Sequence, residues 1–96
     1  MSNFVYILHS ERLSRFYIGS TQKPVVERLG EHNSVLNKNS YSSKGQPWVL
    51  YYTIACESKS QALSIEKHIK RMKSKVYTSN LKRYPQLVDK LKFRYS

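Results

Sequence analysis

The chain is 96 residues long, which suits one domain with two packed layers around a single hydrophobic core. Its 17 lysine and arginine residues against 6 aspartate and glutamate residues give a formal net charge of +11, which predicts attraction to a polyanion such as DNA or RNA. The single cysteine, Cys56, excludes an intrachain disulfide and a multi-cysteine zinc site and favours a reduced, cytoplasmic protein.

The N-terminal segment predicts a β-hairpin. Residues 4–8 form a β-branched and aromatic run typical of a strand, and residues 16–19 form a second such run. The polar residues between them suit a slightly long hairpin loop. The opening Met-Ser-Asn-Phe lacks the basic and apolar segments of a secretory signal, and no apolar run approaches the roughly 20 residues that span a bilayer. We therefore expect no membrane partner.

A helix and the strongest strand are predicted next. Pro24 suits the first turn of a helix, because its φ is fixed and it has no N–H to leave unpaired. Helical spacing then predicts roughly three turns. The inward-facing positions of this helix are Val25, Leu29, His32 and Leu36. Residues 37–46 have the composition of a loop, and residues 47–55 have the composition of a strand.

The C-terminal half is predicted to be helical and basic. It holds eleven basic and three acidic residues from Cys56 onward. Ser58 and Gln61 have the spacing of a capping box that opens a second helix. The predicted buried face of that helix comprises Ala62, Ile65, Ile69 and Met72. Residues 73–75 mark a break, a third helical piece runs through residues 76–81, and a short last helix follows Pro85.

These elements give the order β-β-α-β-α-α. We expect a small α/β (α+β) fold in which a three-stranded, mainly antiparallel sheet is flanked by helices. No internal repeat, low-complexity tract or Gly/Pro-rich linker interrupts the chain, so residues 1–96 are predicted to form one domain.

Glu66 is the only acidic residue of the predicted second helix. Its position lies at the margin of the apolar face, within a strongly basic segment. A carboxylate there could hold a hard cation such as Mg²⁺ through one oxygen, with waters and a substrate phosphate completing the shell. The alternative is an ordinary ion pair with Lys70, four residues further along the helix.

Arg28 and His32 form a second candidate pair. They are four residues apart and share one face of the predicted helix. A guanidinium can grip a phosphate with two hydrogen bonds, while a nearby imidazole moves a proton or donates a hydrogen bond. The alternative is that Arg28 pairs with Glu27 or Glu31 and that His32 is a half-buried polar residue.

Tyr6 and Tyr17 fall on the two strands of the predicted hairpin. If they face each other across the ladder, they project from the same side of the sheet. Two phenols there could position water and phosphate oxygens, or one could act as a base if its pKa were lowered. The alternative is ordinary strand packing, the role predicted for Tyr51 and Tyr52.

In this chain order the candidates resemble the GIY-YIG endonucleases. The first signature tripeptide corresponds to Val5-Tyr6-Ile7, a relaxed match, and the second to Tyr17-Ile18-Gly19. Arg28 and His32 match the family's next helix, and Ala62-x-x-x-Glu66-Lys67 matches the helix with the metal-binding glutamate. Many members also have an asparagine about a dozen residues after the glutamate. Here Thr78 stands at that spacing, and Asn80 requires a shift of two residues.

The resemblance implies the GIY-YIG fold and a metal-dependent phosphodiesterase site. It implies that Tyr6 activates or positions the attacking water, that Tyr17 helps to hold the water or phosphate, and that His32 assists proton transfer. Arg28 would stabilise negative charge on the phosphoryl group. Glu66 would bind one divalent ion, Mg²⁺ or Mn²⁺, that stabilises the leaving oxygen.

The basic helices predict a surface that contacts phosphates. Its members are Lys67, Lys70, Arg71, Lys73 and Lys75, continued by Lys82 and Arg83. No recognition helix or zinc finger is visible, so binding of DNA, with RNA as a further option, is expected to depend on shape and charge. One alternative function is a nucleic-acid-binding module that keeps the fold without catalysis. Another is a partner subunit whose basic face binds an acidic protein or RNA.

Overall fold

The computed structural model describes residues 2–34 and 41–96. The elements in chain order are β1 (Asn3–Ser10), β2 (Arg15–Thr21), α1 (Val25–His32), the 3₁₀ helix η1 (Tyr41–Gly45), β3 (Trp48–Cys56), α2 (Lys59–Met72), α3 (Lys75–Arg83) and α4 (Pro85–Arg94). The predicted antiparallel sheet flanked by helices is confirmed. No helix in these described segments is both long and apolar enough to cross a membrane.

The sheet has the strand order β2-β1-β3, so the first strand lies in the centre. Both neighbours pair with β1 in the antiparallel direction. A tight turn at Ser14, which has a φ of 52°, closes the β1–β2 hairpin. Because β1 is buried on both faces, its alternating side chains organise two separate layers of packing.

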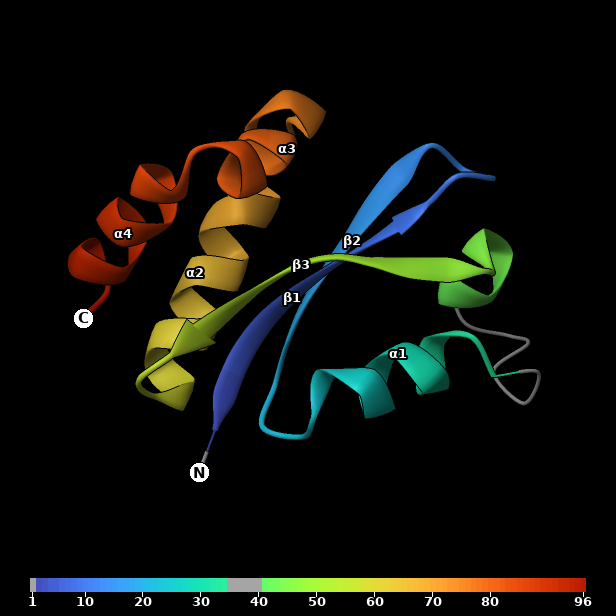
Figure 1. The fold of residues 1–96 in the computed structure, drawn as a ribbon, viewed down its shortest axis with the longest axis horizontal. Coiled ribbons are helices and arrows are strands. Elements are labelled where there is room, and N and C mark those ends of the chain that lie inside the picture. Colours follow the sequence, from blue (N-terminus) through green and yellow to red (C-terminus); the bar gives the residue numbers. More distant parts are fainter. Residues whose placement is uncertain (1, 35–40) are drawn as a thin grey trace.

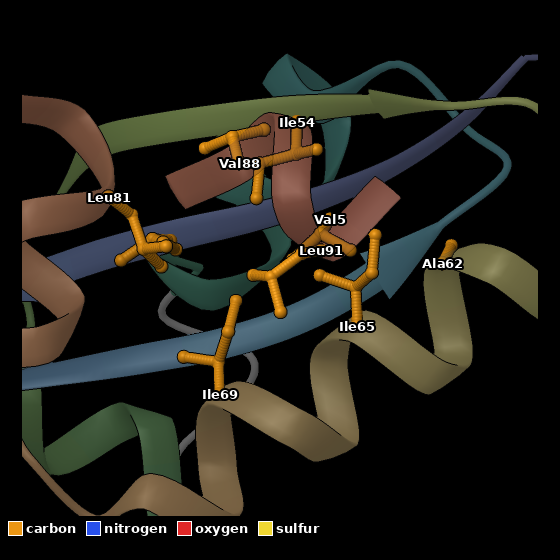
Figure 2. Packing of buried hydrophobic residues seen from close by; sticks show 9 residues of the cluster. Val5, Ile54, Ala62, Ile65, Ile69, Leu81, Val88 and Leu91 are labelled. Carbon is orange, nitrogen blue, oxygen red and sulfur yellow. The ribbon is translucent and has the colours of Figure 1, made fainter. Parts of the chain in front are cut away.

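The helices are divided between the two faces of the sheet. α1 lies on one face, and α2, α3 and α4 lie on the other (Figure 1). On the α1 face, Tyr6, Leu8 and Trp48 form a small buried cluster against which Val25 and Leu29 pack. On the opposite face, strand residues such as Val5 and Ile54 meet the three C-terminal helices (Figure 2). The helical members of that larger core are Ala62, Ile65, Ile69, Leu81, Val88 and Leu91.

Hydrogen-bonding caps explain where the C-terminal helices begin. The Ser58 hydroxyl accepts from the N–H of Gln61 at 3.0 Å, which confirms half of the predicted capping box. The Gln61 side chain instead accepts from the N–H of Glu57 at 2.7 Å and donates to the carbonyl of Lys92 at 3.0 Å. Ser74 caps α3 by accepting from the N–H of Tyr77 at 3.0 Å.

The structure corrects several details of the predicted elements. Met72 is 46% exposed, so its assignment to the buried face of α2 is wrong. The reason is that Met72 is the last residue of α2, just before the left-handed C-cap Lys73, and the last turn of the helix leaves the core. α1 stops at His32, and Leu36 lies outside the described residues. The short last helix predicted after Pro85 is present as a ten-residue element, and the predicted order β-β-α-β-α-α counts one helix too few after β3.

Candidate active site

The two signature tyrosines project from the α1 face of the sheet but are not directly opposite each other. Tyr6 is paired with Gly19, and Tyr17 is paired with Leu8. Paired residues share a face, as do residues two apart on a strand, so the two phenols are diagonal neighbours. Their ring centroids are 6.4 Å apart. The expectation that they lie on one side therefore holds, while the direct pairing does not.

Gly19 provides the space that the Tyr6 ring occupies. A Cβ atom built on Gly19 would lie 2.5 Å from both Cζ and the hydroxyl oxygen of Tyr6. Any larger residue would have to displace the phenol. Our sequence interpretation used Gly19 only as part of the Tyr-Ile-Gly motif and missed this contact, whose only sequence signal is the glycine itself.

Helix α1 brings Arg28 and His32 onto the Tyr6 hydroxyl. The hydroxyl lies 3.1 Å from Nε2 of His32, and Nη2 of Arg28 donates to it at 3.5 Å. The rings of Tyr17 and His32 are 4.4 Å apart between centroids. Four of the five predicted catalytic residues thus converge in one cluster, drawn from two strands and one helix.

The C-terminal end of α1 is fixed to β3 by polar contacts that sequence reasoning missed. The Asn33 side chain accepts from the N–H of Trp48 at 2.6 Å and donates to its carbonyl at 2.8 Å. The Gln46 amide donates to the carbonyls of His32 and Ser34, at 2.8 and 2.9 Å. These bonds hold the last turn of α1, and with it His32, against the sheet.

Burial sets the charge states of the cluster. Tyr6 is only 1% exposed, and burial raises its pKa above the usual 10.0 although Arg28 opposes this. Burial and then the Arg28 charge lower the pKa of His32 below 6.5. At neutral pH the phenol therefore keeps its proton and the imidazole is neutral. This argues against Tyr6 as a phenolate base in the free protein.

Two buried nitrogens of the cluster have no hydrogen-bond partner among the described residues. They are Nε of Arg28 and Nδ1 of His32. Unpaired buried polar atoms are uncommon and are often found at functional sites. Arg28 is otherwise well held, because Nη1 donates to Glu31 at 2.8 Å and the Arg28 side chain is only 32% exposed. The predicted alternative pairing with Glu31 is thus also present, alongside the contact with Tyr6.

Glu66, the fifth predicted catalytic residue, lies in the other layer of the fold. It lies on α2, which covers the opposite face of the sheet and contacts the edge strand β2. Its carboxylate accepts from Nζ of Lys70 at 2.6 Å, and its side chain is only 15% exposed. The predicted helical ion pair is therefore present. No hydrogen bond joins Glu66 to the other four residues in the described part of the chain, but its charge contributes to the raised pKa of Tyr6.

The acidic and histidine side chains do not form a closed metal site. No group of three or more His, Cys, Asp or Glu residues with metal-binding geometry occurs within residues 2–34 and 41–96. Glu66 alone fits a hard cation that keeps most of its waters and also binds a substrate phosphate. For that, the carboxylate would have to exchange its contact with Lys70 for the ion.

The predicted nucleic-acid-binding residues divide into two groups. Lys70, Lys73 and Lys75 line a groove between β2 and the α2–α3 junction. Lys67 and Arg71 lie exposed on α2 and do not line it. Asn80 lies on α3, and its carbonyl accepts from the N–H of Tyr84 at 2.7 Å.

On the α1 face of the three-stranded sheet, two phenols lie beside an arginine and a histidine of the following helix, the arrangement expected from the resemblance to the GIY-YIG endonucleases. The sequence matches the family model described as the GIY-YIG catalytic domain over residues 2–83. The chain therefore belongs to the GIY-YIG family, and its function is of the nuclease type, with nucleic acid as substrate. No curated protein and no solved structure gave a significant match.

Proposed function

We propose that the chain is a divalent-metal-dependent endonuclease that hydrolyses DNA phosphodiester bonds. We further propose that it has little intrinsic sequence specificity, that it acts in the cytoplasm in DNA repair or recombination, and that residues 1–96 act as one domain. One observation carries the proposal: four of the predicted catalytic side chains lie in one cluster. His32 and Arg28 contact the Tyr6 hydroxyl, and the Tyr17 ring lies beside the rings of Tyr6 and His32.

Arg28 is the group best placed to meet a phosphate. It is the partly exposed cation of the cluster, and a guanidinium binds a phosphate with two parallel hydrogen bonds. Movement of its Nη2 group onto the phosphate would release the Tyr6 hydroxyl, which it contacts at 3.5 Å. The positive charge would then offset the negative charge that develops on the phosphoryl oxygens.

Tyr17 and the Tyr6–His32 pair would handle the attacking water. Tyr17 is partly exposed and would hold the water beside the phosphate. In a relay, the water gives a proton to the Tyr6 oxygen as the Tyr6 hydroxyl proton passes to Nε2 of His32. The neutral state of His32, which its lowered pKa favours, leaves that nitrogen able to accept.

Glu66 would hold the divalent ion, Mg²⁺ or Mn²⁺, through one carboxylate oxygen. The bound ion supplies Lewis-acid stabilisation of the leaving oxygen. The chain's own contribution is to keep that carboxylate at the β2 edge, within electrostatic reach of Tyr6.

Substitution of Glu66 tests the proposal. Glu66→Gln should abolish Mg²⁺-dependent cleavage of plasmid and branched DNA while leaving DNA affinity intact, because the side-chain shape is kept and only the charge is lost. Glu57→Gln is the matched control, since Glu57 is exposed and precedes the same helix. Cleavage by Glu66→Gln at the rate of the control would remove Glu66 from the mechanism.

A non-catalytic nucleic-acid-binding module is the second candidate. The ion pair between Glu66 and Lys70 favours it, because a carboxylate neutralised by lysine suits binding to DNA without any metal. This candidate predicts that the wild-type chain binds DNA and cleaves none with either Mg²⁺ or Mn²⁺.

A further inference from the structure

A basic groove lies on the side of the sheet opposite the tyrosine cluster. It has a volume of about 540 Å³ and runs between β2 and the junction of α2 with α3. This volume falls within the roughly 300–1,000 Å³ typical of ligand sites. Among the residues that line it in the described part of the chain are Arg15, Lys70, Lys73 and Lys75, and none is acidic. An anionic ligand is therefore favoured.

The floor of the groove contains an aromatic side chain held from two sides. The Phe16 ring lies 5.0 Å from the His9 ring and 4.9 Å from the Tyr51 ring, in both cases between centroids. Tyr51 is itself fixed, because its hydroxyl donates to the carbonyl of Ser79 at 3.4 Å and Nζ of Lys82 lies 4.8 Å from its ring centroid. Phe16 is therefore an aromatic ring held in the lining of the groove, together with Ile18 and Ile69.

The groove adjoins the carboxylate assigned to the metal. Lys70 lines the groove and also contacts Glu66 at 2.6 Å. Lys73 has a φ of 49°, the left-handed conformation that turns the chain from α2 into α3. A ligand that contacts Lys70 in the groove would therefore lie near Glu66, and it could also contact Lys73 and Lys75.

We propose that this groove binds an unpaired nucleic-acid strand that leads away from the scissile phosphate. A base would stack on Phe16, and the backbone phosphates would contact Lys73 and Lys75. The faces of bases are covered by their neighbours in a duplex, so the Phe16 ring can stack only on a base that is unstacked from its neighbours. The inference rests on the proposed nuclease function for its link to the scissile phosphate, and it predicts a preference for DNA with a single-stranded branch.

Binding of matched DNA ligands tests the groove without requiring cleavage. The probes are a blunt duplex and the same duplex with a short oligothymidine extension, titrated by fluorescence anisotropy with the Glu66→Gln chain and no metal. The extension should tighten binding by about tenfold. Phe16→Leu should remove most of this gain and leave the affinity for the blunt duplex unchanged. Phe93→Leu is the matched control, because Phe93 is 85% exposed on α4.

Charge variants and cross-linking locate the extension. A double variant in the groove, Lys73→Asn with Lys75→Gln, should reduce the affinity gained from the extension. The reduction should be larger than in a control double variant outside the groove, Lys67→Gln with Lys90→Gln. Iodouracil in the extension should cross-link to peptides containing Phe16 or Tyr51. Thermal denaturation of each variant verifies that it is folded.

Two results would overturn the groove assignment: an extension that adds no affinity, or a gain that Phe16→Leu retains in full. Wild-type cleavage of the blunt duplex is measured separately in Mg²⁺. If the extension effect holds and no DNA of either form is cut, the nuclease proposal fails while strand binding in the groove stands. If the blunt duplex is cut and the extension has no effect, the groove proposal alone fails.

Discussion

Tyr6 and Gly19 show how one side chain can occupy the space left by another residue's missing Cβ. The phenol crosses the paired strand at the one position in the hairpin without a side chain. Its hydroxyl can then reach His32 and Arg28 on α1. The geometry of the cluster therefore depends on a residue with no functional group of its own.

Gly19→Ala is expected to destabilise the protein by about 1–3 kcal/mol, because the added methyl would overlap the Tyr6 ring. Urea denaturation measures this change. Gly30→Ala is the matched control. A Cβ on Gly30 meets nothing within 4 Å, so on helix α1 this substitution should stabilise by about 0.5–1 kcal/mol. Equal effects of the two substitutions would contradict the packing account.

His32 makes folding stability depend on pH. Its pKa in the folded protein is lowered below 6.5 by burial and by the nearby Arg28, so the unfolded chain binds the proton more readily. The free energy of unfolding should be highest above pH 6.5, fall as the pH drops below that value, and stop falling below the folded-state pKa.

Unfolding free energies measured from about pH 5 to about pH 8 check this dependence. His32→Gln should show a shallower fall than the wild type. Some slope should persist, because burial also lowers the pKa of His68. Parallel curves for the two proteins would show that His32 does not titrate as described.

The sequence predicted the side chains of the tyrosine cluster better than the residues that hold them in place. Arg28 and His32 could be placed together because residues four apart share a helix face. The roles of Asn33 and Gln46 could not be predicted, because each depends on a partner brought near by the fold. Tyr6 and Tyr17 required the hairpin register, which a polar loop of seven residues leaves undetermined.

At the α2–α3 junction, one residue with a side chain adopts a backbone conformation that is unfavourable for it. Lys73 has a φ of 49°, a region that costs a residue with a Cβ roughly 1–2 kcal/mol. The sequence predicted a break at residues 73–75, but it also predicted that Met72 is buried. Helical periodicity shows which face of a helix is apolar, but it does not show where along the helix the contact with the core ends.

Lys73→Gly should raise the free energy of unfolding by about 1 kcal/mol, because glycine adopts the left-handed conformation without steric cost. The same replacement at Lys67, an exposed position inside α2, should lower it by about 1 kcal/mol. Chemical denaturation of the two variants provides the comparison. A loss of stability in both would mean that the turn is not strained.

For the molecule as a whole, the last helix extends the core beyond the part that defines the family. The family match ends at residue 83, whereas α4 spans Pro85–Arg94 and contributes Val88 and Leu91 to the larger buried cluster (Figure 2). The Gln61 side chain on α2 also donates to the carbonyl of Lys92 on α4 at 3.0 Å, and the hydroxyl of Tyr95, directly after α4, lies 2.9 Å from Nδ1 of His68 on α2. We propose that α4 folds with the rest as one domain.

Leu91→Ala should therefore cost about 2–5 kcal/mol in the free energy of unfolding, since Leu91 is 4% exposed. Leu63→Ala is the control from the neighbouring helix, where the side chain is 39% exposed, and it should cost less than about 1 kcal/mol. A two-state transition with the larger loss only for Leu91→Ala is the expected result. A small effect at Leu91 would indicate that α4 is not part of the cooperative unit.

In the proposed reaction the two layers of the fold act on one phosphodiester, through Arg28 on α1 and Glu66 on α2. Single-turnover cleavage in Mg²⁺ should be measured for Arg28→Lys, Glu66→Asp and the double variant, conservative changes chosen so that rates remain measurable. Each single change should slow cleavage at least about tenfold, and the double variant should be little slower than the worse single variant, because residues that act as a unit are not additive. Fully multiplicative effects, or full activity in either single variant, would contradict the account.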